Sequence, residues 1–153
     1  QLVQEILGQH GEQGESDDGM ELGVCYLTEN MEEMRFSGAR FDLFIADNGE
    51  IETISGTKKG IGYRGISPDQ HYDLYELELK PSQSFYMTSD GLIDQVGGEK
   101  RRGFGKRRFR ELIASVQSYP LTEQREHVLE ALADYQQDET RRDDVAVLGF
   151  KFE

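Results

Sequence analysis

The sequence predicts an α+β domain with antiparallel strands. In residues 19–28, large apolar side chains alternate with polar or small ones, and residues 72–79 show a similar alternation. This period of two is typical of a half-buried strand. The pair Asn48-Gly49 lies between two short apolar segments and is a strong signal for a hairpin turn. In the last third of the chain, apolar residues recur at helical spacing instead. The sequence therefore predicts that the first part of the chain forms mostly strands, and that helices and one final strand follow.

The early strands are expected to form an antiparallel meander. In chain order, the expected strands cover residues 19–28, 34–39, 41–46 and 50–54. A short strand or a close backbone approach is expected at 61–63, where glycines interrupt the pattern. A turn at 81–83 should then join the strand 72–79 to the apolar segment that begins at Phe85. These two antiparallel strands would lead to Asp90.

Helices are expected at three places. Apolar residues on one helical face of residues 1–9 indicate the last turns of a helix, which a mobile loop over 8–18 would follow. Two further helices are predicted over 106–117 and 122–137, the second with a capping start at Thr122. The final strand is expected over residues 145–152.

Composition excludes several classes of function. The 153 residues carry a net charge of −13, so most of the surface would repel the phosphates of nucleic acids and of anionic membranes. The single cysteine, Cys25, permits no intrachain disulfide, and no apolar segment approaches the length of a membrane span. We therefore expect a cytoplasmic protein without membrane contact. Because the chain begins at Gln1, we also expect it to be part of a longer protein.

Asp90 lies where an apolar segment ends abruptly. The string Thr88-Ser89-Asp90-Gly91 follows directly on this segment. A strand end is stiff, and Gly91 lets the backbone turn sharply, so the carboxylate of Asp90 could be held in a fixed direction. Such a position suits a metal ligand or a catalytic acid, although the same string is also an ordinary turn.

A second acidic boundary precedes the last strand. Asp143 and Asp144 stand side by side directly before an apolar segment. Adjacent carboxylates repel each other unless they are solvated, paired with Arg141 or Arg142, or neutralised by a cation. Two carboxylate sites at the ends of neighbouring strands would permit a site for a hard cation.

These motifs carry a family resemblance. TSDGLID at 88–94, the later Phe104-Gly105 and RRDDVAVLGF at 141–150 resemble the C-terminal half of a SpoIIE-like member of the PPM family, the metal-dependent (type 2C) serine/threonine protein phosphatases. FSGAR at 36–40 and KGIG at 59–62 resemble the middle section of that family. The resemblance therefore extends over nearly the whole chain.

The resemblance implies a fold and an extent. Members of the family form a sandwich of two antiparallel sheets with helices packed outside. Residues 1–153 would be a single domain that is the C-terminal portion of such a phosphatase domain, incomplete at its N-terminal side.

The resemblance also implies two Mn²⁺ or Mg²⁺ ions. It assigns Asp90 and Asp143 as metal ligands, supported by Gly91 and Asp144 beside them, and it implies no catalytic residue beyond the metal ligands. Carboxylate oxygens are the ligands that hard divalent cations prefer. Two such ions can share a water and generate the hydroxide that attacks phosphorus.

The acidic motifs of the family's first half have no counterpart in the sequence. The nearest string, Asp17-Asp18-Gly19, is interpreted as a solvated turn. Because Asp90 and Asp143 alone are too few ligands for two ions, we expect this chain to be a catalytically incomplete fragment. The parent protein would remove phosphate from phosphoserine or phosphothreonine of a partner protein, in bacterial signalling of the partner-switching type. The alternative is a non-catalytic, phosphatase-like interaction or regulatory module.

A basic segment follows the Asp90 motif. Seven of the 17 basic residues lie within positions 100–110. We interpret this segment either as a solvated loop and helix face or as a surface for docking the phosphoprotein substrate. The docking candidates are Arg101, Arg102, Lys106 and Arg107. Exposed edges of an incomplete sheet further predict a homodimer.

Overall fold

The computed structural model describes residues 3, 6, 17–67 and 69–152. Contacts within the chain define two compact units. The first unit contains the chain up to residue 43 together with residues 54–79, and the second contains residues 44–53 and 80–153. Val3 and Ile6 are helical, as predicted, whereas most of the loop expected over 8–18 lies outside the described residues.

The first unit is built on a three-stranded antiparallel sheet. Its strands are β1 (Leu22–Leu27), β2 (Glu33–Ala39) and β5 (Leu74–Glu78), in the order β1-β2-β5. On the central strand β2, Met34 and Phe36 are wholly buried, and the ring of Phe36 lies 6.5 Å from that of Tyr75. The alternation in the sequence therefore separates a buried face from an exposed one, as the period of two predicts.

The second unit contains a four-stranded antiparallel sheet. Its strands are β3 (Leu43–Asp47), β4 (Glu50–Ile54), β6 (Gln83–Thr88) and β9 (Val147–Lys151), in the order β4-β3-β6-β9. The hairpin between β3 and β4 is confirmed, because Asn48 and Gly49 have φ angles of 49° and 94°. Only asparagine and glycine adopt these left-handed angles readily, as a two-residue hairpin requires.

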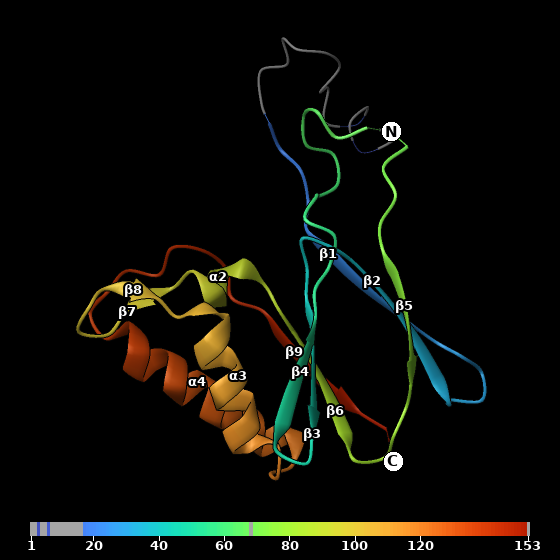
Figure 1. Cartoon of the computed structure of the whole chain (residues 1–153). Helices are drawn as coiled ribbons and strands as arrows, with labels where there is room; N and C mark the ends of the chain where they lie inside the picture. Colours follow the sequence, from blue (N-terminus) through green and yellow to red (C-terminus); the bar gives the residue numbers. More distant parts are fainter. Residues whose placement is uncertain (1–2, 4–5, 7–16, 68, 153) are drawn as a thin grey trace. The chain divides into compact units, whose positions relative to one another are not determined.

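Helices and a small ribbon complete the second unit. They are α2 (Asp90–Ile93), β7 (Val96–Gly97), β8 (Arg102–Gly103), α3 (Gly105–Val116) and α4 (Leu121–Gln136), with β7 and β8 paired. In Figure 1, α3 and α4 run side by side next to the β4-β3-β6-β9 sheet. Both helices pack their apolar residues into a common core with the sheet, where the ring of Phe109 meets that of Phe44 edge-on at 5.0 Å. The predicted α+β class with antiparallel sheets and packed helices is confirmed.

The predicted meander is correct for the pairs β1–β2 and β3–β4 but wrong for the connection between them. The strand β2 pairs with β5 instead of β3, and β3 pairs with β6, so no continuous meander forms. β5 and β6 belong to different sheets, and Asp90 is therefore positioned by β6 between β3 and β9. The burial patterns agree with the observed pairing, because β3 and β6 are both almost wholly buried, whereas exposed and buried residues alternate in the first half of β2.

Of the two alternatives expected at residues 61–63, the close backbone approach is confirmed, because Ile61 and Met20 form an isolated bridge with two hydrogen bonds. The β7–β8 ribbon was not predicted. The capping start at Thr122 does not form, because α4 begins at Leu121 without a side-chain cap. Gln124, in the first turn of α4, is buried and donates to the main-chain oxygen of Tyr119. Among the described helices, none combines the length and apolar character needed to cross a bilayer.

Candidate metal-binding edge

The two acidic motifs lie at the same end of the second sheet. β6 and β9 are antiparallel neighbours, and their pairing ends with Thr88 opposite Val147. The chain leaving β6 reaches Asp90 two residues later, and the chain entering β9 passes Asp143 shortly before that strand begins. Antiparallel pairing therefore brings the two motifs to one edge, although 53 positions separate Asp90 from Asp143 in the sequence.

Hydrogen bonds from Ser89 and Thr88 join the two segments. The Ser89 hydroxyl donates to the Asp144 oxygen at 3.1 Å and accepts from the Ala146 amide at 3.0 Å. The Ser89 amide and the Thr88 hydroxyl both donate to the Ala146 oxygen, at 3.0 and 3.1 Å. These contacts fix the backbone directly before Asp90 and directly after Asp143.

Gly91 allows the closest approach between the segments. A Cβ atom on Gly91 would lie 2.2 Å from the main-chain oxygen of Asp144 and 3.3 Å from the carbonyl carbon of Asp143. The first distance is too short for any larger residue without movement of the backbone. The residue after Asp90 is thus in direct contact with the backbone of the Asp143-Asp144 pair.

All three acidic residues of this edge, Asp90, Asp143 and Asp144, are exposed to solvent. One carboxylate oxygen of Asp143 accepts a hydrogen bond from the Asp144 amide at 2.7 Å, which orients the Asp143 side chain. Asp144 contributes its main-chain oxygen to the contact with Ser89, so its observed role is structural.

The donor chemistry of this edge suits a hard divalent cation, because carboxylate oxygens are the preferred ligands of Mg²⁺ and Mn²⁺. The number of donors does not suffice. Within residues 17–67 and 69–152, the structure has no group of three or more acidic, histidine or cysteine side chains that could hold a metal ion. Metal ligation by Asp90 and Asp143 stays a prediction, and the described residues supply only part of a site.

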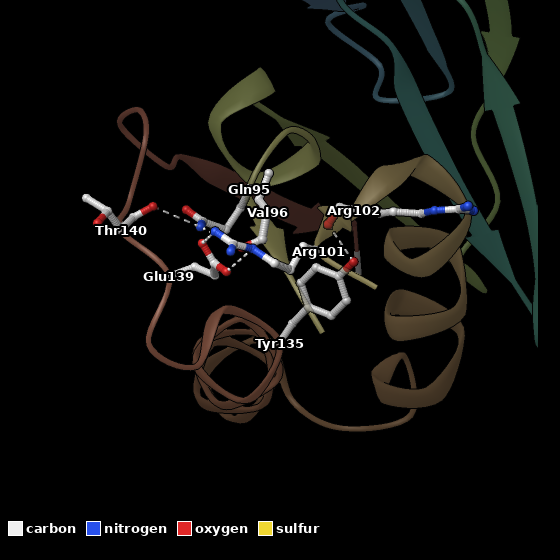
Figure 2. A network of polar contacts seen from close by, with 7 residues as sticks. All are labelled: Gln95, Val96, Arg101, Arg102, Tyr135, Glu139 and Thr140. Carbon is white, nitrogen blue, oxygen red and sulfur yellow. Dashed lines mark hydrogen bonds and ion pairs between the residues drawn. The ribbon is translucent and has the colours of Figure 1, made fainter. Parts of the chain in front are cut away.

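A second set of contacts anchors the loop that leads to Asp143. Figure 2 shows Gln95, wholly buried, whose amide nitrogen donates to the oxygens of Val96 at 3.0 Å and Thr140 at 3.3 Å. Arg101 binds Glu139 through two contacts, of 2.7 and 3.0 Å. The β7–β8 ribbon is therefore attached to the connection between α4 and β9.

The basic segment is partly engaged within the protein. The charge of Arg101 is offset by Glu139, and Arg107 lies 3.6 Å from Glu111 on the exposed side of α3. Arg108 stacks 4.8 Å over the ring of Tyr135. Arg102 lies in β8, and Lys106 and Arg107 lie in the first turn of α3. The ribbon is also close to α2, because a Cβ atom on Gly103 would lie 3.2 Å from the Ile93 oxygen.

Sequence reasoning missed two residues of this edge. Ser89 was given no role of its own in the string that contains Asp90, yet its hydroxyl connects the two acidic segments. Its place directly before Asp90 was the available signal, because serine side chains commonly bond to nearby backbone groups. Gln95 carries no signal in spacing or periodicity, since its burial depends on residues about 45 positions away.

Solved structures with the same fold are longer than this chain. The SiaA-PP2C domain of Pseudomonas aeruginosa superposes with a TM-score of 0.81 at 34% identity, covering 88% of this chain and 52% of that structure. The phosphatase domain of SpoIIE from Bacillus subtilis gives a TM-score of 0.66 at 13% identity, covering 88% and 56%. The Mycobacterium tuberculosis serine/threonine phosphatase PstP/Ppp gives 0.63 at 14% identity, covering 99% and 67%.

The chain thus spans about half the length of the first two solved structures. The SpoIIE and PstP/Ppp structures are less than 25% identical to this chain and therefore support only its fold. Among curated proteins, no significant match was found. The family profile of stage II sporulation protein E (SpoIIE) matches residues 3–153. With that match over nearly its whole length, the chain belongs to the SpoIIE family and has the fold of PP2C phosphatase domains.

Proposed function

We propose that this chain is the C-terminal portion of a metal-dependent serine/threonine protein phosphatase domain, within a longer cytoplasmic bacterial signalling protein of the partner-switching type. Residues 1–153 would belong to one such domain. The observation that supports the proposal most strongly is the contact of Gly91 with the Asp143-Asp144 backbone, which brings two acidic motifs to one edge. Family membership supplies the class of reaction.

In the intact domain, Asp90 and Asp143 would hold Mn²⁺ or Mg²⁺. Such ions, when bound, offset charge on a phosphate and activate water at neutral pH. The residues of this chain contribute rigidity, since the Ser89 hydroxyl and Gly91 fix the backbone on which the two carboxylates stand. Ligands fixed in this way need little reorganisation when the ion binds.

The basic segment would assist binding of a phosphoprotein substrate. Arg102, Lys106 and Arg107 lie on β8 and the first turn of α3, near the α2 turn that carries Asp90. Guanidinium groups bind phosphate through two parallel hydrogen bonds, so arginine suits this role. Arg101 would contribute less, because its guanidinium already pairs with Glu139.

The test uses the longer protein that contains this chain. We expect its Mn²⁺-dependent hydrolysis of a phosphoserine peptide to fall about 100-fold or more in Asp90→Asn and in Asp143→Asn, because each loses a metal ligand. Asp134→Asn, at an exposed position of α4, is the matched control and should keep its activity. Unchanged activity and metal dependence in both site variants would refute the assignment.

Residues 1–153 alone should be inactive, since the described part supplies no group of three ligands. The same shortage of ligands favours the second candidate, a non-catalytic module that binds a regulator. If the longer protein is also inactive with Mn²⁺ and Mg²⁺ but binds a partner through its basic segment, the second candidate is correct. Robust hydrolysis by residues 1–153 would contradict our view of the missing ligands.

A further inference from the structure

The hairpin between β3 and β4 contains an asparagine followed by a glycine. Asn48 and Gly49 form the whole of its two-residue turn, and both are exposed. The main-chain nitrogen of the next residue can attack an asparagine carboxamide, a reaction that makes asparagine one of the less heat-stable residues in proteins. Glycine hinders this attack least, because it has no Cβ atom beside its nitrogen. The turn therefore combines the two groups that react most readily in this way.

The packing of the glycine distinguishes this pair from the two aspartate-glycine pairs of the sequence, which can cyclise in the same way. A Cβ atom on Gly19 would lie 2.4 Å from an aromatic ring, and one on Gly91 would lie 2.2 Å from a main-chain oxygen. These two glycines are tightly packed, so their backbone has no space to move towards a side chain. A Cβ atom on Gly49 would instead meet the side-chain nitrogen of Gln117 at 3.8 Å, an ordinary contact.

The contacts of the turn leave the reacting atoms accessible to each other. In a two-residue turn, the closing hydrogen bond joins the residues on either side of the central pair, so the Gly49 amide is not part of it. The Asn48 carboxamide donates to the Asp47 carboxylate at 2.8 Å, and this bond is exposed. Such a bond stabilises little, because water readily replaces either partner. Asn48 can therefore turn its carboxamide towards the Gly49 nitrogen.

Asn30, the other asparagine of the chain, provides an internal comparison. It is also exposed and lies in the turn after β1. Its carboxamide oxygen accepts from the Thr28 hydroxyl at 2.7 Å, and its carboxamide nitrogen donates to Glu32 at 2.6 Å. The next residue is Met31, whose side chain hinders attack by its main-chain nitrogen. The two asparagines thus share their exposure and differ in hindrance and in the constraint on the carboxamide.

We propose that Asn48 is a site of spontaneous deamidation that yields aspartate and isoaspartate. The Gly49 nitrogen forms a bond to Cγ of Asn48 while the bond from Cγ to Nδ2 breaks, and the amide proton of Gly49 leaves with that nitrogen as ammonia. The resulting succinimide ring then takes up one water molecule. Opening at Cγ gives aspartate, whereas opening at the main-chain carbonyl gives isoaspartate, in which the backbone passes through the former side chain. Either product adds one negative charge.

The two products differ in their effect on the hairpin. Aspartate keeps the backbone and, like asparagine, tolerates the left-handed φ of 49° at this position. Isoaspartate inserts an additional main-chain atom into a turn whose geometry fixes the register of the two strands. The outer strand β4 is also held by Arg110, which donates to the Ile51 oxygen at 2.8 Å. We therefore expect isoaspartate to loosen β4 from β3 and α3, independently of any phosphatase activity.

The test follows both asparagines in the longer protein that contains this chain. The folded protein is incubated at mildly alkaline pH, and trypsin then releases residues 41–58, which contain Asn48. Mass spectrometry with electron-transfer fragmentation distinguishes isoaspartate from aspartate. We expect conversion at Asn48 to be at least about tenfold faster than at Asn30, because glycine follows only Asn48. Equal rates would overturn the proposal, as would conversion of Asn48 in urea but not in the folded protein.

Hydrogen exchange of the separated isoaspartate form then tests the effect on the hairpin. Residues 50–54 should exchange at least about tenfold faster than in the unmodified protein, whereas residues 147–151 of β9 should exchange equally. Asn48→Asp, which reproduces the aspartate product, is the matched control and should exchange like the unmodified protein. If the isoaspartate form exchanges like Asn48→Asp, the inferred loosening of β4 is wrong.

Discussion

Gly91 and Asp144 are so close that a Cβ atom on Gly91 would lie 2.2 Å from the Asp144 main-chain oxygen. Gly91→Ala must therefore push apart the two segments that carry Asp90 and Asp143. Because the obstacle is backbone, we expect the free energy of unfolding to fall by about 1–3 kcal/mol. Urea unfolding of residues 1–153 measures this loss, and Mn²⁺ titration of the longer protein should show weaker binding.

Gly97→Ala is the control that separates the loss of stability in Gly91→Ala from its effect on Mn²⁺ binding. A Cβ atom on Gly97 would lie 1.9 Å from the main-chain oxygen of Tyr135, so this variant also forces backbone apart. It should lose similar stability while its Mn²⁺ affinity changes less, because no acidic ligand stands beside Gly97. Equal loss of Mn²⁺ affinity in both variants would mean that general destabilisation, and not the spacing of Asp90 and Asp143, weakens the site.

Ser89→Ala removes the hydroxyl that bonds to both Asp144 and Ala146. The main-chain oxygen of Asp144 and the Ala146 amide then lose their partner, and we expect a loss of about 1–1.5 kcal/mol in the free energy of unfolding, since both hydrogen bonds are exposed. Ser115→Ala is the control. Its hydroxyl bonds only to the Leu112 oxygen on the exposed side of α3, so the change should stay within about 0.5 kcal/mol. Equal effects in the two variants would refute a special role for Ser89.

The local elements of this protein could be predicted from its sequence, whereas their partners could not. The helices α3 and α4, the Asn48-Gly49 hairpin and the strands are within a few residues of their predicted positions. Periodicity and turn chemistry act over neighbouring residues and are visible in the sequence. The pairing of β2 with β5 and of β3 with β6 depends on which faces are buried, which no local pattern specifies.

The same contrast between local signals and distant contacts applies to the candidate site. Asp90 and Asp143 stand out because carboxylates at strand ends are recognisable and because the motifs resemble a known family. The residues that connect their segments, Ser89 and Gln95, act through contacts with chain more than 40 positions away. Sequence reasoning thus found the charged groups and missed the neutral side chains that position them.

Gln95 should matter more for stability than the ion pair beside it. Gln95→Leu keeps the side-chain size but leaves the partly buried oxygens of Val96 and Thr140 without their donor. We expect a cost of about 1–2 kcal/mol, because the loss of two hydrogen bonds is partly offset by removal of the buried Oε1 atom of Gln95, which has no partner among the described residues. Glu139→Gln removes the charge that Arg101 binds. The Arg101 side chain is 74% exposed, so this loss should be below about 1 kcal/mol. A larger effect of Glu139→Gln in urea unfolding at 150 mM salt would contradict this ranking.

Tyr86 is expected to make stability sensitive to alkaline pH. Its hydroxyl donates to Gln124 at 2.7 Å, and burial raises the pKa of the phenol above its ordinary value. The folded state therefore holds the phenolic proton more tightly than the unfolded state does. This contribution is fully present below the unfolded pKa of about 10 and is lost as the pH rises through the higher folded pKa.

Tyr86→Phe tests that linkage. At pH 7 the variant should be less stable by about 1–3 kcal/mol, because the buried oxygen of Gln124 loses its donor. Above about pH 10 the difference in the free energy of unfolding should shrink, because ionisation of Tyr86 in the unfolded state destabilises only the protein that has this tyrosine. Tyr26→Phe, at a position 58% exposed, should show neither effect. If the Tyr86→Phe difference in the free energy of unfolding stays constant from pH 7 to about pH 11, the raised pKa of Tyr86 does not contribute to stability.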